Sequence, residues 1–136
     1  MISSYNAAAQ TVAVGSAYTF DTNRITTGCT VGHVPGTTTF TLTKPGYYYI
    51  TFNTVFTTDA TGEATVEIQN NGTVVPGATA TETVATVGAA TSMSISTIVR
   101  VLPSCAAIDN TAQITIVAPD LALNVSTAAI NITKLC

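Results

Sequence analysis

The sequence predicts an all-β fold of two packed antiparallel sheets, and three observations lead to that prediction. Threonine is abundant, whereas leucine and the long charged residues that favour helices are scarce. Short β-branched and aromatic runs are separated by Gly, Pro, Asn and Asp, which is typical of a sandwich or barrel of short strands. The 136 residues suit one domain with a single core. We expect that domain to span residues 1–136, with 1–9 as a flexible lead.

The first half of the chain alternates predicted strands with turns that contain glycine or proline. Lys44-Pro45-Gly46 is typical of a tight turn, because proline fixes φ and glycine supplies a positive φ. Asn70-Asn71-Gly72 favours a hairpin turn, and residues 28–36 are predicted to form a loop. The strands predicted in this half are residues 10–14, continued by 18–20, then 38–43, 47–57, 64–69 and a short one at 73–75.

The second half begins with a stretch that has no clear pattern, after which apolar and polar residues alternate again. Residues 76–90 are rich in Ala and Thr, and we expect a surface loop there, with an edge strand as the alternative. Pro103 ends the next strand, because proline cannot donate to a ladder. The strands predicted here are 92–102, 113–117, 121–125 and 128–135. The total of about eight to ten strands is enough for two sheets.

Residues 47–57 form the longest predicted strand, and its two faces differ. Side chains alternate between the faces of a strand. The first face is apolar and is assigned to the core: Tyr48, Ile50, Phe52 and Phe56. The second face carries Tyr47, Tyr49, Thr51, Asn53 and Val55. Because exposed tyrosines beside a valine would form an unexplained apolar patch on a monomer, we expect this second face to be covered.

The composition limits the classes of function. Charged residues make up 8% of the chain, against roughly a quarter in an ordinary soluble domain. Its surface is therefore built from uncharged polar residues, or another chain covers part of it. The net charge is −3, and the four basic residues are scattered along the sequence, which argues against nucleic-acid binding.

The N-terminal residues carry neither a basic region nor an apolar region of a secretory signal. No apolar run approaches the roughly 20 residues that a membrane span requires. We therefore expect no membrane insertion, and a protein that stays where it is made or leaves by assembly or lysis.

Residues 40–52, which read FTLTKPGYYYITF, resemble the signature of the C1q/TNF-like jelly-roll superfamily. Phe40, Gly46, Tyr48 and Phe52 fall in register with that signature. Ile50 stands where the family usually has Phe, and His33 stands where an aromatic residue upstream of Phe40 is usual. Further along, residues 66–72 and 128–133 are similar to the family's next strand and its closing strand. In its low charge and its richness in Thr and Ala, the sequence is most similar to bacterial C1q-like modules of spore-surface and phage virion proteins.

The resemblance implies a jelly roll that assembles as an obligate homotrimer, with the second face of 47–57 on the threefold axis. Tyrosine suits such a contact, because it supplies apolar area and a hydroxyl group. An interface would also account for the low charge, since part of each chain's surface would leave water. The alternative is that loops of the same chain cover the tyrosines. The interface residues predicted on this basis are Tyr47, Tyr49, Thr51, Asn53, Val55, Ile114, Ile116, Asn131 and Leu135.

Groups that could support catalysis are few. His33 is the only histidine, and Cys29 lies four residues before it, but a loop histidine beside a structural thiol accounts for this pair without a dyad. The sequence contains neither a Gly-x-Ser-x-Gly elbow nor a phosphate-binding glycine loop. Cys29, Cys105 and Cys136 are either free thiols or one disulfide with a spare thiol, and their spacing fits no zinc site. We expect no enzymatic activity.

Calcium is the one cofactor that the sequence leaves open. Asp21-Thr22-Asn23 and the segment from Asp59 to Glu63 place oxygen ligands in predicted loops, as a hard cation prefers. The competing interpretation is that these residues bond their own backbone in turns. We favour turns and expect no cofactor.

The leading functional hypothesis is a homotrimeric structural or adhesive module on a particle surface: a phage fibre, a capsid decoration or a bacterial spore coat. Such a protein is made in the cytoplasm and used outside the cell, and its partners are other copies and other surface proteins. The alternative is a C1q/TNF-like module that recognises a host protein or glycan. The absence of tryptophan, which stacks well on sugar rings, disfavours that alternative.

Overall fold

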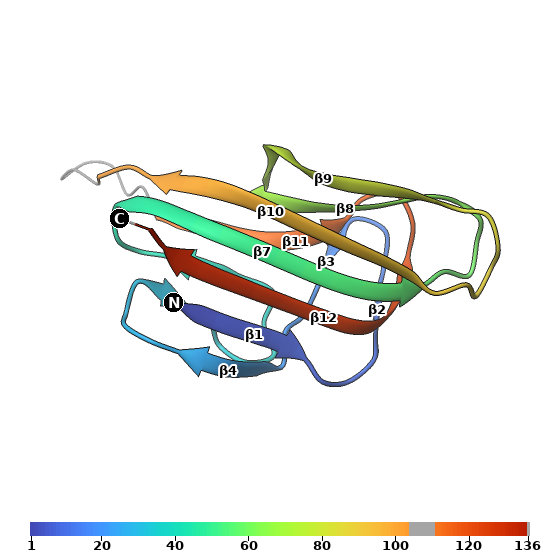
Figure 1. Ribbon diagram of the computed structural model, residues 1–136, viewed down its shortest axis with the longest axis horizontal. Helices are drawn as coiled ribbons and strands as arrows, with labels where there is room; N and C mark the ends of the chain where they lie inside the picture. The colour runs from blue at the N-terminus through green and yellow to red at the C-terminus, as the bar shows by residue number, and fades with distance from the viewer. Residues whose placement is uncertain (104–110, 136) are drawn as a thin grey trace.

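The computed structural model describes residues 1–103 and 111–135, and within them every regular element is a strand (Figure 1). The strands form two six-stranded antiparallel sheets that pack as a jelly-roll-like sandwich, which confirms the predicted fold class. Sheet A has the order β10-β7-β12-β1-β4, with β2 also paired to β12; sheet B has the order β5-β6-β11-β8-β9, with β3 paired to β11. Sheet A contains β1 (Ile2–Asn6), β2 (Gln10–Val12), β4 (Thr22–Thr26), β7 (Gly46–Thr57), β10 (Thr91–Val101) and β12 (Leu123–Lys134). Sheet B contains β3 (Ser16–Ala17), β5 (Val31–Gly32), β6 (Phe40–Leu42), β8 (Gly62–Asn70), β9 (Thr73–Val84) and β11 (Ala112–Ala118).

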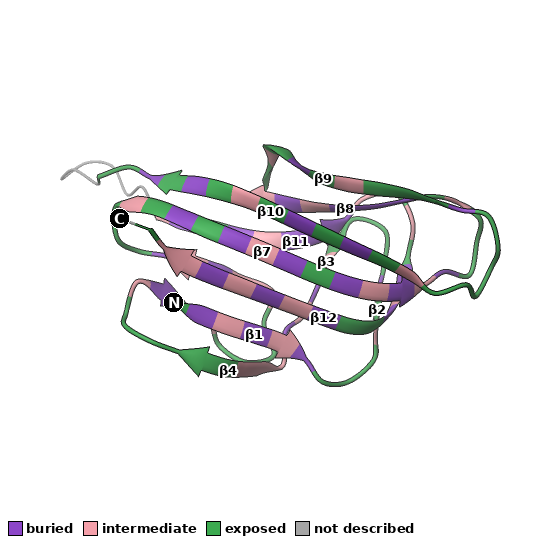
Figure 2. Ribbon diagram, viewed as in Figure 1, coloured by how far each residue is buried: buried purple, intermediate pink, exposed green. Residues whose placement is uncertain are grey.

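The core lies between the sheets and follows the period of two that strands impose. Figure 2 shows buried and more exposed residues alternating along β7, β10 and β12. The segment at residues 40–52 supplies the centre of this core, because Phe40, Tyr48, Ile50 and Phe52 are all fully buried. Gly46 starts β7 with a φ of 143°, a conformation that favours glycine.

Strand β11 requires a correction to the predicted interface. Ile114 and Ile116 are both fully buried between the sheets. They pair with Asn70 and Ile68 of β8, in the interior of sheet B, so they cannot reach the outer face of sheet A. The outward positions of β11 are instead taken by Gln113 and Thr115, which alternate with the two isoleucines.

The N-terminal residues lie inside a sheet, although we expected a flexible lead over residues 1–9. Strand β1 pairs with β12 on one side and β4 on the other. Its inward positions include Ser4 and Asn6, which are buried but hydrogen-bonded: the Ser4 hydroxyl donates to the Thr22 carbonyl at 2.9 Å, and the Asn6 amide donates to the Ala8 carbonyl. These polar residues hide the apolar alternation that identifies strands from sequence.

Several other elements differ from the prediction. Strand β9 lies at the edge of sheet B and occupies much of residues 76–90, where the edge strand was the alternative to a loop. Strand β5 lies within the loop predicted at 28–36, and β4 was not predicted. Residues 121–125 and 128–135, predicted as two strands, belong to the single strand β12, whose register shifts between Val125 and Thr127. A bulge of this kind bends a strand without ending it.

Candidate functional site

The outer face of sheet A is the candidate site, because it carries the second face of β7. Tyr47 and Tyr49 are 43% and 41% exposed in the single chain, so the described loops leave both rings open to solvent. Thr51, Asn53 and Val55 continue the same row along β7. The neighbouring strands β10 and β12 pair with β7 over most of its length, so that this face is continuous.

Apolar side chains gather at one end of this face. Tyr49 lies between Ile98 of β10 and Thr133 of β12. Tyr47 lies opposite Arg100, whose guanidinium carbon is 5.6 Å from the ring centroid, a cation–π distance. The backbone N–H of Leu135 donates to the Tyr47 carbonyl at 2.7 Å, which holds Leu135 beside the tyrosine. Ile98 and Leu135 are 54% and 53% exposed. We name these four exposed residues the tyrosine patch: Tyr47, Tyr49, Ile98 and Leu135.

The remainder of the face is polar and more recessed. The Asn131 side-chain amide donates to the Thr51 hydroxyl at 3.3 Å, which fixes a row across β12 and β7. Asn53 lies between Ser94 and Ala129, two small residues, and a hollow of about 250 Å³ opens there. The face therefore combines projecting rings at one end with a hollow further along.

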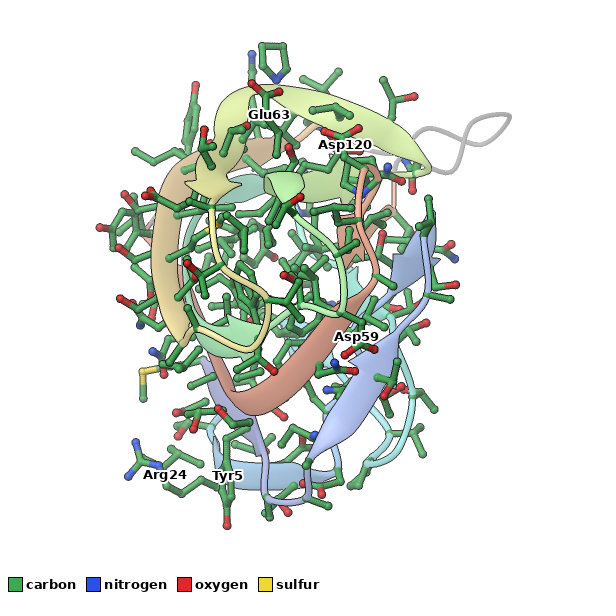
Figure 3. All side chains as sticks on the ribbon, turned by 90° about the vertical axis from the view of Figure 1, so that its right-hand side faces the viewer. Tyr5, Arg24, Asp59, Glu63 and Asp120 are labelled. Carbon is green, nitrogen blue, oxygen red and sulfur yellow. The ribbon has the colours of Figure 1, made fainter. Side chains whose placement is uncertain are left out.

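Charge is divided between the two sheets. The strands of sheet A contain no acidic residue but carry three cations, Arg24, Arg100 and Lys134. The strands of sheet B contain no cation in the described chain, but carry Glu63, Glu67 and Glu82. In Figure 3, Glu63 of β8 and the loop residue Asp120 lie near the top of the view, and Arg24 of β4 lies at the bottom. Sheet A is therefore the side that a partner could cover without burying a carboxylate of its strands.

His33 and Cys29 do not form a catalytic pair. The His33 ring nitrogens contact the Asn23 side-chain oxygen at 2.6 Å and the Thr37 carbonyl at 3.0 Å. Its ring also stacks on Phe40. Cys29 is an exposed free thiol, and Cys105 and Cys136 lie outside the described residues. The contacts of His33 are structural.

The residues considered for calcium bond to the protein itself. The Asp21 carboxylate accepts the backbone N–H groups of Ala7 and Ala8 at 2.9 and 3.3 Å, which lowers the pKa of this carboxyl group. The Asp59 carboxylate accepts the Asn124 amide at 3.0 Å. Within residues 1–103 and 111–135, no three His, Cys, Asp or Glu side chains come together as a metal site would require.

Over the same residues, no helix is long and apolar enough to cross a membrane.

The structure also adds residues that the sequence prediction missed. Ile98 and Arg100 of β10 adjoin the tyrosines, and Ser3 and Tyr5 of β1 extend the face beyond β12. A signal for Ile98 was present, because it is an isoleucine in the otherwise polar alternation of Ser92, Ser94 and Ser96. It could not be assigned until pairing with β7 placed it beside Tyr49.

Comparison with known proteins identifies a shared fold and leaves the family open. No family model matches the chain, and no curated protein matches it by sequence. Among solved structures, the chain is similar to PRD1 vertex protein P5, with a TM-score of 0.59 and 15% identity over 99% of this chain and 96% of that one. The jelly-roll sandwich is shared with a vertex protein. A family 35 carbohydrate-binding module from an environmental isolate matches at a TM-score of 0.42 and 12% identity over 100% of this chain and 98% of that one, which is too distant to support an argument. Neither name refers to C1q or TNF.

Proposed function

We propose that this chain is a homotrimeric structural or adhesive module on the surface of a particle, such as a virion fibre, a capsid decoration or a spore coat. The observation that carries the proposal is the tyrosine patch on a sheet whose strands have no acidic residue. Exposed tyrosine, isoleucine and leucine side chains are costly on a monomer and useful in an interface.

The shared fold supports the particle surface as the site of action. PRD1 vertex protein P5 matches over almost the whole of both chains, so the likeness is not confined to one hairpin. A low charge content is also compatible with permanent assembly, because chains buried against one another need fewer charges for solubility. In this proposal the chain binds other copies and neighbouring surface proteins, and it has no catalytic role.

In a cyclic trimer each contact is heterologous, which means that one surface of a copy meets a different surface of the next copy. We place Tyr47, Tyr49 and Thr51 at the threefold axis, with Asn53, Val55, Asn131 and Leu135 around them. Ile98 joins this set because it borders Tyr49 in the sheet. Ile114 and Ile116 leave it because they lie in the core of one chain.

Light scattering on the purified chain at micromolar concentration tests the proposal. We expect a mass of three times the 13.9 kDa of one chain. Tyr49→Glu should produce folded monomers, because a carboxylate would be buried without a partner. Gln113→Glu places the same charge on the exposed outer face of sheet B and should leave the trimer intact. A monomeric wild-type chain, or equal masses for both variants, would refute the proposed assembly.

A further inference from the structure

A second surface feature lies at the side of the sandwich, where the edge strands β9 and β10 border a groove of about 310 Å³. One wall is formed by Val74, Val75 and Pro76 of β9, and the other by Ile98 and Arg100 of β10. Asn70, at the end of β8, also lines it. The groove is distinct from the hollow at Asn53 on the outer face.

A bulge in β9 shapes this groove. Glu67 pairs with Thr79, but Gln69 pairs with Val74, so the four residues 75–78 stand opposite a single residue of β8. Gly77, with a φ of 82°, allows the chain to leave the ladder there, and Pro76 cannot donate to a further strand. In Figure 1 the start of β9 rises away from the sheet at this place. The bulge therefore makes a wall, and it also prevents a strand from pairing with β9.

Asn70, which lines the groove, carries an acceptor that no other described residue satisfies. Its side-chain oxygen is buried, and no hydrogen-bond donor among residues 1–103 and 111–135 reaches it. A buried polar atom without a partner is uncommon in native proteins and costs free energy until a donor arrives. An occupant that brings an N–H or O–H group to this oxygen, after the Asn70 side chain has turned toward the groove, would remove that cost.

Strand β10 offers the rest of a binding edge. Among the described strands it pairs with β7 alone, so the backbone groups on its other side are free for a further strand. Neither proline nor glycine interrupts β10 over Thr91–Val101, and such an edge accepts added strands unless it is protected. Arg100 is exposed at the rim and has no acidic partner among the described residues, which favours an anionic occupant.

We propose that this groove binds an extended acidic peptide segment of a partner protein, which adds a strand to the free edge of β10. Side chains of the added strand alternate between faces. One residue with a hydroxyl or amide group points inward and donates to Asn70. A neighbouring residue points outward and places its carboxylate at Arg100. Val74, Val75 and Ile98 provide apolar contacts for the peptide. This site lies outside the tyrosine patch apart from Ile98, and it does not depend on trimer formation.

Titration of the ¹⁵N-labelled full chain with three capped peptides, followed by NMR, tests the inference. The first peptide, Ac-TVESEVT-NH₂, has a central serine as donor and two flanking glutamates. We expect saturable shifts of the Asn70 side-chain amide and of the Val75 and Val99 backbone amides. Replacing the serine by alanine should weaken binding by about threefold to tenfold, the effect of one lost hydrogen bond. Replacing both glutamates by glutamine should weaken it by about twofold to fivefold.

Two matched variants of the protein test whether Arg100 makes the contact with the peptide's glutamate. Arg100→Gln should remove the preference for glutamate over glutamine, whereas Arg24→Gln on β4 should leave it unchanged. These comparisons leave Asn70 intact, so they do not depend on a variant at the β8–β9 turn. Absence of saturable shifts at millimolar peptide, or equal binding of all three peptides, would overturn the inference. Shifts of the Asn70 and Val75 amides, which belong to sheet B and lie away from the trimer face, on dilution of the protein alone would show that a second copy, and not a partner peptide, occupies the groove.

Discussion

His33 lies flat on Phe40, with ring centroids 4.1 Å apart and ring planes inclined by 11°. The same imidazole contacts the Asn23 side-chain oxygen and the Thr37 carbonyl. Asn23 belongs to β4, an edge strand of sheet A, and Phe40 belongs to β6 of sheet B. One side chain therefore joins the two sheets.

This contact predicts that the protein becomes less stable below neutral pH. Burial lowers the pKa of His33 below its usual 6.5, and the Thr37 carbonyl opposes that shift only in part. Because the folded state binds a proton less readily than the unfolded chain, its stabilising contribution is present above pH 6.5. It is lost as the pH falls through that value towards the lower folded pKa. Urea unfolding between pH 7.5 and about 5 measures the effect.

His33→Gln should flatten this pH dependence, since His33 is the only histidine of the chain. The variant should also lose stability at pH 7.5, because the stack and the one hydrogen bond that a neutral imidazole donates each contribute about 0.5–1.5 kcal/mol. If the wild-type chain instead gained stability on acidification, the oxygens of Asn23 and Thr37 would be holding a charged imidazolium, and the predicted sign would be wrong.

How far the sequence predicts this fold depends on whether inward positions are apolar. Strand β7 was predicted almost to its ends, because Tyr48, Ile50 and Phe52 alternate with more polar residues. Strand β1 was missed, because its inward Ser4 and Asn6 look like a loop until their hydrogen bonds are known. The same difference applies to the candidate site. The exposed tyrosines could be predicted from the alternation of one strand, whereas Arg100 and the Asn70 groove depend on how strands distant in sequence pair and pack.

A second prediction concerns the buried hydrogen bond between Tyr18 and Thr54. The Thr54 hydroxyl donates to the Thr127 carbonyl at 3.1 Å, so the Tyr18 hydroxyl, 3.2 Å away, is the donor to Thr54. Tyr18→Phe should cost about 0.5–1.5 kcal/mol, because Thr54 keeps its other partner. Thr54→Val should cost more, about 1–3 kcal/mol, because it leaves the buried phenol without an acceptor. Equilibrium unfolding of both variants would contradict this account if the order of the two losses were reversed.

The same phenol predicts an alkaline transition. Burial raises the pKa of Tyr18 from 10.0 to about 12, despite the opposing hydrogen bond to Thr54. The folded state therefore favours the neutral phenol, and its contribution is present below pH 10.0 and lost as the pH rises towards 12. Unfolding free energies between pH 9 and 12 should fall less steeply in Tyr18→Phe than in the wild-type chain. Equal slopes would show that Tyr18 does not control this transition.

Gly46 provides a prediction about backbone conformation. Its φ of 143° is one that L-amino acids with a side chain rarely adopt, so Gly46→Ala should cost about 1–3 kcal/mol. Gly32→Ala is the matched control, because Gly32 has no such φ and an added Cβ would meet no atom within 4 Å. Its stability should change by no more than about 0.5 kcal/mol. Thermal unfolding of Gly46→Ala and Gly32→Ala measures the difference. Equal stability of the two variants would show that position 46 does not require glycine.

The buried isoleucines of β11 separate a core role from an interface role. Ile116 is fully buried between the sheets, so Ile116→Ala should lower the free energy of unfolding by about 2–5 kcal/mol. Its neighbour Thr115 faces outward from sheet B, and Thr115→Ala should change stability by no more than about 0.5 kcal/mol. Both variants should keep the wild-type mass in light scattering under conditions where they remain folded. If Ile116→Ala instead changed the mass while leaving the unfolding free energy intact, the residue would belong to a contact between copies, and the face of sheet A assigned to the trimer would have to be reconsidered.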